Sequence, residues 1–535
     1  FYTWRLSMTN SIRFNSRANL SPERMSEIKT RMARNNRDLF YKHVDFELWD
    51  CIQNTFDKRS SQQVFSDLRE AALDERVTKT FRNVEATMES IEHYKGSEVP
   101  SFIWNENFRL ASALLEKYLK VTILKPLQID SVDSLLDSMT NKSASAGAIC
   151  DGSKGENAPE ILDEFFKMKS QIAEGLIPRI PCLLFHRSQI SGYYVDDHLD
   201  IDSIKYKDRA IWGSDAASVA IEAQYARPLI EHLSRNCNWY AGGKHPDELR
   251  GFIYNGSPNA NWYSLDFSKF DQTVPSWLIR HVFWLIKKFY PEQCFAELDW
   301  VEDNFINTEI VTYYGDVFTK HRGIPSGSHF TQVVGSMCNM LVILTYIIKR
   351  GRDVNTLVNL ESYVEGVLDY NKYRGIRMFV MGDDNLFYSR TDVDLEDMSR
   401  YVQKNFGMVI HPDKTESFKS TGNRCPSFLK RTWTMNGEKR NVSEMLINVI
   451  HPERPRKYDT YRPIHIIYGL FLTYKGSMSA HITEKDILKT MSEDGGIEGL
   501  RQLKPNDLPG SLRILGDKAG EYMYRRAKAS LGLSD

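Results

Sequence analysis

The sequence lacks the short signatures of several common protein classes. None of its seven cysteines forms a CxxC pair, so reduced thiols are expected in place of a zinc module or a disulfide framework. No GxxxxGK[ST] segment is present, which argues against a P-loop NTPase. The most apolar run, 337–348, is shorter than the about 20 residues that a membrane span needs, and the N-terminus shows no signal-peptide pattern. We therefore expect no transmembrane helix and no membrane partner.

A dominant charge of either sign is also missing. The 535 residues contain 69 Lys and Arg against 70 Asp and Glu, which gives a net charge of −1 and excludes a protein that is basic throughout. A local basic channel remains compatible with this balance, because nucleic-acid binding depends on local charge. With 41% apolar and 26% charged residues, the composition is that of a globular chain of several domain-sized pieces.

The first segment that carries chemistry is WYSLDFSKFDQT, 262–273. Its apolar start predicts a strand that ends at Asp266, and Asp271 follows before an amphipathic helix with Pro275 near its start. A carboxylate at the end of a strand is held rigidly, which suits a metal ligand. The alternative is an acid in an ordinary surface turn.

The second segment is RMFVMGDDNLFYS, 377–389. Two apolar runs flank Gly382-Asp383-Asp384-Asn385, a composition typical of a tight hairpin turn. Most such turns are merely solvated, but adjacent carboxylates repel each other and favour a cation such as Mg²⁺. If this hairpin and the strand before Asp266 are neighbours in one sheet, the acids hold two ions about 3.5–4 Å apart, as in-line displacement at phosphorus requires.

The third segment is HRGIPSGSHFTQVVGSMCN, 321–339, a loop followed by a helix expected over about 330–349. Gly327 permits close approach of the backbone to a ligand, and Ser326 and Thr331 offer hydroxyl groups. An ordinary helix N-cap at Ser328 would explain the serines equally well.

LDFSKFD, SGSHFT and MGDDN, in this order, resemble motifs A, B and C of viral RNA-dependent RNA polymerases. The GIPSGSHFTQ form with GDDN is most similar to the polymerases of small double-stranded-RNA viruses, first picobirnavirus and then partitivirus. The resemblance covers 205–431.

The resemblance implies catalysis by two Mg²⁺ ions, for which Mn²⁺ is able to substitute, on Asp266, Asp383 and Asp384. It also implies nucleotide binding by Asp271, Ser326, Gly327 and Thr331. Many relatives have Asn where this chain has Gly335, and whether Asn339 contacts the ribose is left open.

Flanking segments resemble further motifs of the family. In IKYKDRAIWG, alternate basic residues would project from one strand face, and the resemblance assigns Lys207 and Arg209 to the nucleotide and Lys205, with Arg187, to RNA. Lys414 would act as general acid toward pyrophosphate, unless it is only a turn lysine. The other RNA-binding residues implied are those of a template-guiding loop that is equally compatible with a plain surface loop, and those of the SFLKR segment: Ser145, Gly147, Lys430 and Arg431.

Basic residues exceed acidic ones between 414 and 462, eleven against five, which suits a nucleic-acid path or a solvated face. Four aromatic residues lie in this stretch, and one of them is a candidate to stack on an initiating nucleotide, although core packing is the commoner role of Trp433. The four are Phe428, Trp433, Tyr458 and Tyr461.

The resemblance implies an α+β fold, a closed right-hand polymerase whose antiparallel palm sheet is backed by helices. We expect an N-terminal extension linking fingers and thumb at 1–95, fingers at 96–258, palm at 259–434 and thumb at 435–535. The implied function is transcription and replication of a viral double-stranded RNA genome, in the virion interior and host cytoplasm. The implied partners are template and product RNA, NTPs and a capsid protein.

Two rival functions remain. Reverse transcriptases usually carry an aromatic residue two positions before the acid pair, where this chain has Met381. A non-catalytic RNA-binding or inner-capsid protein with a decayed polymerase fold would not need Asp266, Asp383 and Asp384 intact.

Overall fold

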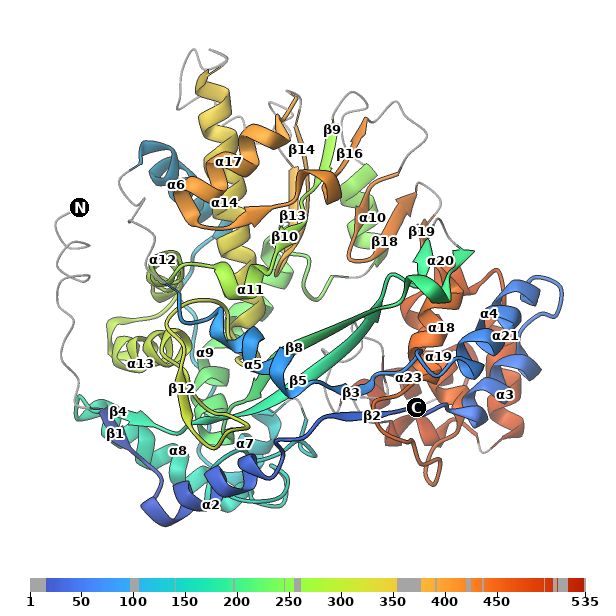
Figure 1. Ribbon diagram of the computed structural model, residues 1–535, viewed down its shortest axis with the longest axis horizontal. Coiled ribbons are helices and arrows are strands. Elements are labelled where there is room, and N and C mark those ends of the chain that lie inside the picture. The colour runs from blue at the N-terminus through green and yellow to red at the C-terminus, as the bar shows by residue number, and fades with distance from the viewer. Residues whose placement is uncertain are drawn as a thin grey trace.

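The computed structural model describes residues 16–96, 105–139, 141–195, 198–244, 246–254, 261–353, 377–389, 392–419, 425–434, 437–494, 496–503, 508 and 518–533. Helices and strands are mixed along the chain. A long two-stranded ribbon runs through the middle of the molecule, a sheet lies above it, and a helical bundle lies at one of its ends (Figure 1). All seven cysteines are free thiols.

A four-stranded antiparallel sheet forms the palm. Its order is β13 (Arg377–Met381), β14 (Asp384–Ser389), β9 (Asn261–Ser264) and β16 (Glu416–Lys419). Successive side chains point to opposite faces, so Met378 and Val380 enter the main core whereas Phe379 enters a second one. Both faces are covered, and this explains why the strands read as continuous apolar runs.

Helices cover the first face of the palm sheet. α14 (Thr331–Asp353) packs on β13 and is crossed by α17 (Leu395–Phe406), α12 (Ser276–Lys287) and α6 (Glu106–Leu119). Among the described residues, one helix, 331–351, is long and apolar enough to cross a membrane, but most of it is buried in this core. The opposite face carries α10 (Pro246–Tyr254) and the small sheet β17 (Ser427–Phe428), β18 (Arg431–Thr434) and β19 (Gly437–Lys439).

The fingers are built on the ribbon of β5 (Cys182–Ser191) and β8 (Lys205–Gly213), which continues into β11 (Glu309–Val311) and β12 (Val317–Thr319). Helices α8 (Ala158–Ala173), α9 (Ala216–Asn236) and α13 (Phe295–Ile306) pack together at its base. Shorter elements complete this region: β1 (Ser16–Ala18), α2 (Pro22–Ala33), α5 (Val84–Glu92), α7 (Val132–Ser138) and β4 (Ile177–Arg179).

The C-terminal helices form a separate bundle, the thumb: α18 (Val442–Ile450), α19 (Pro463–Thr473), α20 (Lys475–Met478), α21 (Glu484–Glu493) and α23 (Ala519–Ser530). Two N-terminal helices, α3 (Phe46–Thr55) and α4 (Gln62–Leu73), share its hydrophobic core. Ile190 and Tyr193 at the far end of the ribbon join the same core.

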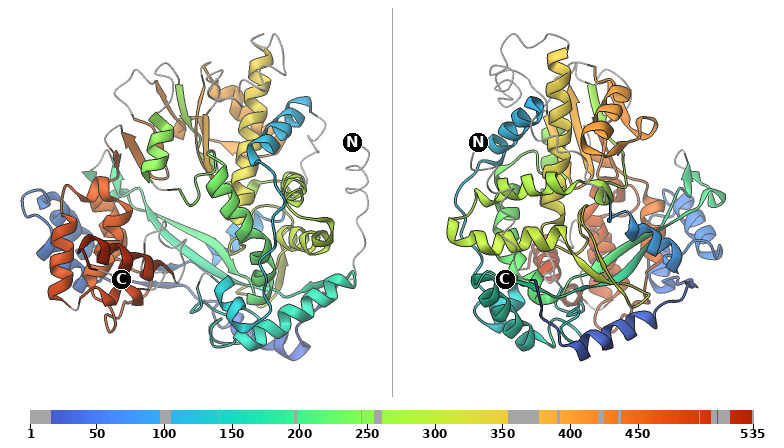
Figure 2. Two further views of the ribbon diagram at one scale, coloured as in Figure 1. Left: turned by 180° about the vertical axis from the view of Figure 1, so that it is seen from behind. Right: turned by 60° about the vertical axis from the view of Figure 1, so that its left-hand side comes forward.

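Fingers and thumb are therefore connected at two points. The β5–β8 ribbon reaches the thumb from beneath the palm (Figures 1 and 2). The N-terminal chain reaches it through β2 (Leu39–Tyr41) and β3 (Thr80–Arg82), an antiparallel pair that flanks α3 and α4 in the chain and lies beside the ribbon. The predicted α+β right hand with an antiparallel palm sheet is confirmed, and these contacts close it into a ring.

Candidate active site

The strand register brings the predicted acids together. β9 and β14 are antiparallel neighbours that pair Tyr263 with Phe387 and Trp262 with Tyr388. Continuing this register past the end of β9 places Asp266 across from Asp384. The prediction that the two acid-bearing strands are neighbours in one sheet is confirmed.

Asn385 fixes this juxtaposition. Its side chain is buried, its Oδ1 accepts a hydrogen bond from Leu265 N at 3.0 Å, and its Nδ2 donates to Leu265 O at 3.2 Å and to Asp383 O at 3.2 Å. One amide therefore links the residue before Asp266 to the acid pair. No role is predicted for Asn385 from the sequence, although an amide next to two acids in a turn is a visible signal.

The acid pair occupies a tight hairpin, as predicted. Met381 pairs with Asp384, which leaves Gly382 and Asp383 as a two-residue loop. Of these two, only Gly382 has a positive φ, +65°, as a type II′ turn requires. Asp383 and Asp384 are both exposed.

Helix α14 supports this hairpin from behind. Gly382 N donates to Ser336 Oγ at 2.8 Å, and Asn339 Nδ2 donates to the carbonyl oxygens of Gly382 at 3.0 Å and Asp383 at 2.9 Å. Asn339 is fully buried, so the question left open is answered against a direct ribose contact. Its amide holds the turn that carries the acids.

The acids raise one another's pKa. Desolvation and then the charge of Asp383 raise the pKa of Asp271 to about 7 and that of Asp384 to about 6, and Asp266 adds to the effect on Asp384. Asp271 and Asp384 are nevertheless accessible to solvent. Repulsion between neighbouring carboxylates favours a bound cation.

The predicted metal ligands are not preassembled. Among the residues that the structure describes, no group of three or more His, Cys, Asp or Glu side chains is positioned to hold a metal ion. The donors themselves, carboxylate oxygens, fit a hard divalent cation such as Mg²⁺.

A row of basic residues lies opposite the acids. Lys205, Lys207 and Arg209 alternate along β8 and are exposed, as predicted, and Arg187 lies across from Arg209 on β5. Burial lowers the pKa of Lys207, as do the charges of Arg209, Lys414 and Lys430, whereas Asp266 raises it. Arg209 in turn lowers the pKa of Asp271.

Lys414 and Lys430 thus reach the same site from separate elements. Lys414 ends the 3₁₀ helix η3 (Pro412–Lys414), which follows the short pair β10 (Phe267–Ser268) and β15 (Val409–Ile410) beside Asp266. Lys430 is exposed in the turn between β17 and β18, and its charge lowers the pKa of Asp384. Both lysines therefore lie close enough to this site for their charges to act on its residues.

The loop before α14 is fastened to its surroundings. Ser326 Oγ accepts from Trp212 N at 2.9 Å, and Thr331 Oγ1 donates to Pro325 O at 2.6 Å. Gly327 has φ +86°, and a Cβ there would lie 2.9 Å from Trp212 O. The two hydroxyl groups predicted to bind ribose therefore make hydrogen bonds within the protein in this structure.

The same loop contacts the segment that carries Asp271. Ile324 N donates to Asp271 O at 2.6 Å, and Gly323 N donates to Val274 O at 2.9 Å. Ser328 Oγ accepts from Phe330 N at 3.1 Å, but α14 begins only at Thr331. Ser328 therefore belongs to the turn before the helix, and its hydroxyl group also donates to Glu222.

Two predicted RNA contacts are wrong. Arg431 is buried, its guanidinium lies over the Tyr474 ring at 4.8 Å from the centroid, and it reaches Thr473 O at 3.4 Å, so it joins the palm to the thumb. Gly147 is also buried, with φ +90°, and an added Cβ would lie 2.6 Å from Asp215 Cα. Glycine is needed there for close packing on the start of α9, whereas Ser145 is exposed.

The proposed stacking residue is also wrong, because all four aromatic candidates are buried. Trp433 is fully enclosed, as its commoner role predicted, and its Nε1 donates to Phe428 O at 3.0 Å. Tyr458 donates to Asp45 at 2.6 Å inside the thumb core, beside Tyr461. None of these rings is accessible to a nucleotide.

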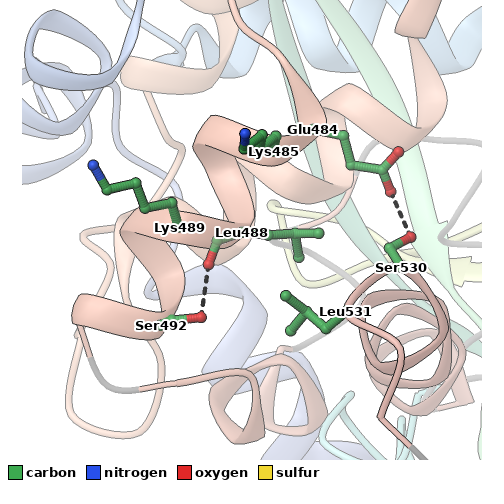
Figure 3. Close-up of a pocket in the computed structure, with 7 residues that line it drawn as sticks. All are labelled: Glu484, Lys485, Leu488, Lys489, Ser492, Ser530 and Leu531. Atoms are coloured by element: carbon green, nitrogen blue, oxygen red, sulfur yellow. Dashed lines mark hydrogen bonds between the residues drawn. The ribbon is translucent and has the colours of Figure 1, made fainter.

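A pocket in the thumb is unrelated to these residues. It has a volume of about 350 Å³ and lies between α21 and the end of α23, where Glu484 bonds to Ser530 and Lys485 and Lys489 line one side (Figure 3). None of the predicted site residues lines it.

The fold is the right-hand fold of nucleic-acid polymerases, and acidic and basic groups face each other in it. Residues 198–452 match the family model described as viral RNA-dependent RNA polymerase, so the resemblance found in the motifs is confirmed. This segment includes all three motifs and the basic row on β8.

Individual proteins agree with the family match. The chain is 35% identical over 222 residues to the RNA-directed RNA polymerase of Cryptosporidium parvum virus 1 (strain KSU-1), which covers 39% of this chain and 38% of that protein. It is 24% identical over 267 residues to non-structural polyprotein 1AB of ovine astrovirus 1, covering 46% and 18%. The chain thus matches less than two fifths of the length of either relative.

A solved structure shares the fold along almost the whole chain. The crystal structure of the RNA-dependent RNA polymerase of a human picobirnavirus superposes with a TM-score of 0.58 at 14% identity and covers 94% of this chain and 95% of that one. At this identity the likeness establishes the fold alone.

Proposed function

We propose that this protein is an RNA-dependent RNA polymerase. The observation that carries the proposal is the meeting of Asp266 and the Asp383–Asp384 hairpin at one end of the palm sheet, opposite the basic row of β8. In the proposed reaction, the 3′-hydroxyl of an RNA chain attacks the α-phosphate of an NTP and pyrophosphate leaves.

We assign the cation sites to Asp266, Asp383 and Asp384. Two divalent ions, Mg²⁺ or Mn²⁺ in its place, would lower the pKa of the attacking hydroxyl and neutralise the departing pyrophosphate. The pKa of Asp384, which burial and then the charges of Asp383 and Asp266 raise, supports this assignment, because a bound cation offsets the repulsion between these carboxylates.

The basic groups are assigned by their position around the acids. Lys207 and Arg209 would bind the triphosphate, with the Arg209 guanidinium suited to bidentate contact, and Lys414 would protonate the pyrophosphate. Asp271 would contact the ribose 2′-hydroxyl beside the loop that carries Ser326, Gly327 and Thr331, since this hydroxyl distinguishes RNA from DNA. The residues assigned to template and product RNA are Lys205, Arg187, Ser145 and Lys430.

We further propose that the enzyme transcribes and replicates a double-stranded RNA genome, in the virion and the host cytoplasm, beside a capsid protein. The motif forms shared with polymerases of small double-stranded-RNA viruses support this part of the proposal.

The test is synthesis of RNA on single-stranded and double-stranded RNA without a primer, with Mg²⁺ or Mn²⁺. Asp383→Asn should lower the rate more than about a hundredfold, because metal ions contribute several kcal/mol to such reactions. Asp163→Asn, an exposed acid on α8, is the matched control and should retain the rate. Full synthesis by Asp383→Asn would refute the assignment.

The same assay separates the rivals. Preference for dNTPs over NTPs on an RNA template would identify a reverse transcriptase. Binding of RNA without synthesis under either metal would favour the non-catalytic alternative.

A further inference from the structure

Glu222 is a carboxylate in an apolar stretch of the fingers. It lies on α9, where all residues from Ala216 to Ala226 are buried, and only 3% of it is exposed. Burying a carboxylate is costly unless hydrogen bonds compensate for lost water. Its partners therefore indicate why an acid occupies this position.

Both partners belong to the loop before α14. Ser328 Oγ donates to Glu222 Oε2 at 2.8 Å, and His329 N donates to the same oxygen at 2.9 Å. The other end of the loop is fixed through Ser326 and Trp212, as described above. Glu222 therefore fixes the second end, and only Gly327, which is exposed, lies between the two anchors.

The positive charge near Glu222 is that of Lys154, which follows Ser145 in the same loop segment of the fingers. Lys154 lies close enough for Asp215 and Glu222 to raise its pKa against the effect of burial. Asp215 is the N-cap of α9 and accepts from Ser218 N at 2.8 Å. Lys154 therefore places a positive charge near Glu222.

We infer that Glu222 is a positioning residue, which holds the 325–330 loop in the conformation that receives the ribose of the incoming nucleotide. This inference rests on the proposed function. Glu222 does not touch the nucleotide itself, since its carboxylate is enclosed, and it acts through the backbone of His329 and the hydroxyl of Ser328.

The test compares Glu222→Ala and Glu222→Gln with a matched control on the same helix. Gln224 is also buried and bonds to Leu127 O at 3.0 Å and Lys169, away from the loop, so Gln224→Ala perturbs α9 alone. The readouts are KM for NTP, kcat, preference for NTP over dNTP, and melting temperature.

Glu222→Ala should raise KM for NTP about tenfold and weaken the preference for NTPs, as expected from losing hydrogen bonds to a charged group. Glu222→Gln should remain within about threefold of wild type, because its amide oxygen can accept the same two bonds. Gln224→Ala should keep wild-type KM and preference even if its melting temperature falls equally. Equal kinetic effects of Glu222→Ala and Gln224→Ala would overturn the inference.

Ser328→Ala gives an independent measurement if Glu222→Ala fails to fold. It should raise KM for NTP about threefold, because it removes one of the two hydrogen bonds that Glu222 accepts from the loop. Unchanged KM in Ser328→Ala would also overturn the inference. Absence of synthesis by the wild-type protein would refute the proposed function instead.

Discussion

Replacing Asn385 with alanine tests whether one amide aligns the acids. The change removes three hydrogen bonds, with Leu265 N, Leu265 O and Asp383 O, at a side chain that is 1% exposed. Each bond contributes about 1 kcal/mol and a stranded buried group costs about 1–3 kcal/mol, so we expect about 3–5 kcal/mol lower unfolding free energy. Guanidinium unfolding followed by tryptophan fluorescence measures this loss.

Asn385→Ala should also lower the catalytic rate of the fraction that remains folded. Displacing reacting groups by about 1 Å costs about a hundredfold in rate, so we expect kcat to fall by about that factor under conditions where the variant remains folded. Asn405→Ala is the control, because it removes a single bond to Tyr401 O within α17. A folded Asn385→Ala variant with wild-type kcat, or one destabilised no more than the control, would refute the argument.

Three further predictions concern the nucleotide site and pH. Asp271→Ala should weaken the preference for NTPs over dNTPs, measured by competition, and an unchanged preference would exclude Asp271 from ribose recognition. Gly327→Ala should impair synthesis more than Gly175→Ala. Both glycines have a positive φ, but only at Gly327 would the added Cβ meet backbone, lying 2.9 Å from Trp212 O. Equal rates of synthesis by the two variants would contradict this reasoning. Burial raises the pKa of Glu222 from 4.5 to about 7, so the folded protein binds this proton more tightly than the unfolded one and stability falls as pH rises through that window, by about 3 kcal/mol. The unfolding free energy of Glu222→Gln should therefore rise relative to that of wild type between pH 5 and pH 8. If the unfolding free energies of the two proteins change with pH in parallel, the pKa of Glu222 is not raised.

Local pattern was sufficient for the elements that carry the acids. The predicted hairpin at 382–385 and the alternation of Lys205, Lys207 and Arg209 were both correct, because turn chemistry and strand period are properties of neighbouring residues. The helix expected over 330–349 runs from Thr331 to Asp353. Its ends differ because a helix terminus depends on packing as well as on propensity.

The roles of buried polar residues could not be predicted in this way. Arg431 and Trp433 lie in a basic, aromatic stretch typical of RNA contacts, yet Arg431 is buried against the thumb and Trp433 is enclosed in the core behind the palm sheet. Asn339 is directed to the hairpin because α14 packs against β13, a contact between segments more than 40 residues apart.

The sequence by itself therefore determined which residues carry charge, where strands and turns form, and that three motifs of a polymerase follow one another. Tertiary structure alone decided which acids meet, through the β9–β14 register and Asn385, and that Glu222 bonds to a loop more than 100 residues away. The physical reason is that hydrogen bonds and burial between distant segments arise only when the core assembles, and no local pattern records the partner.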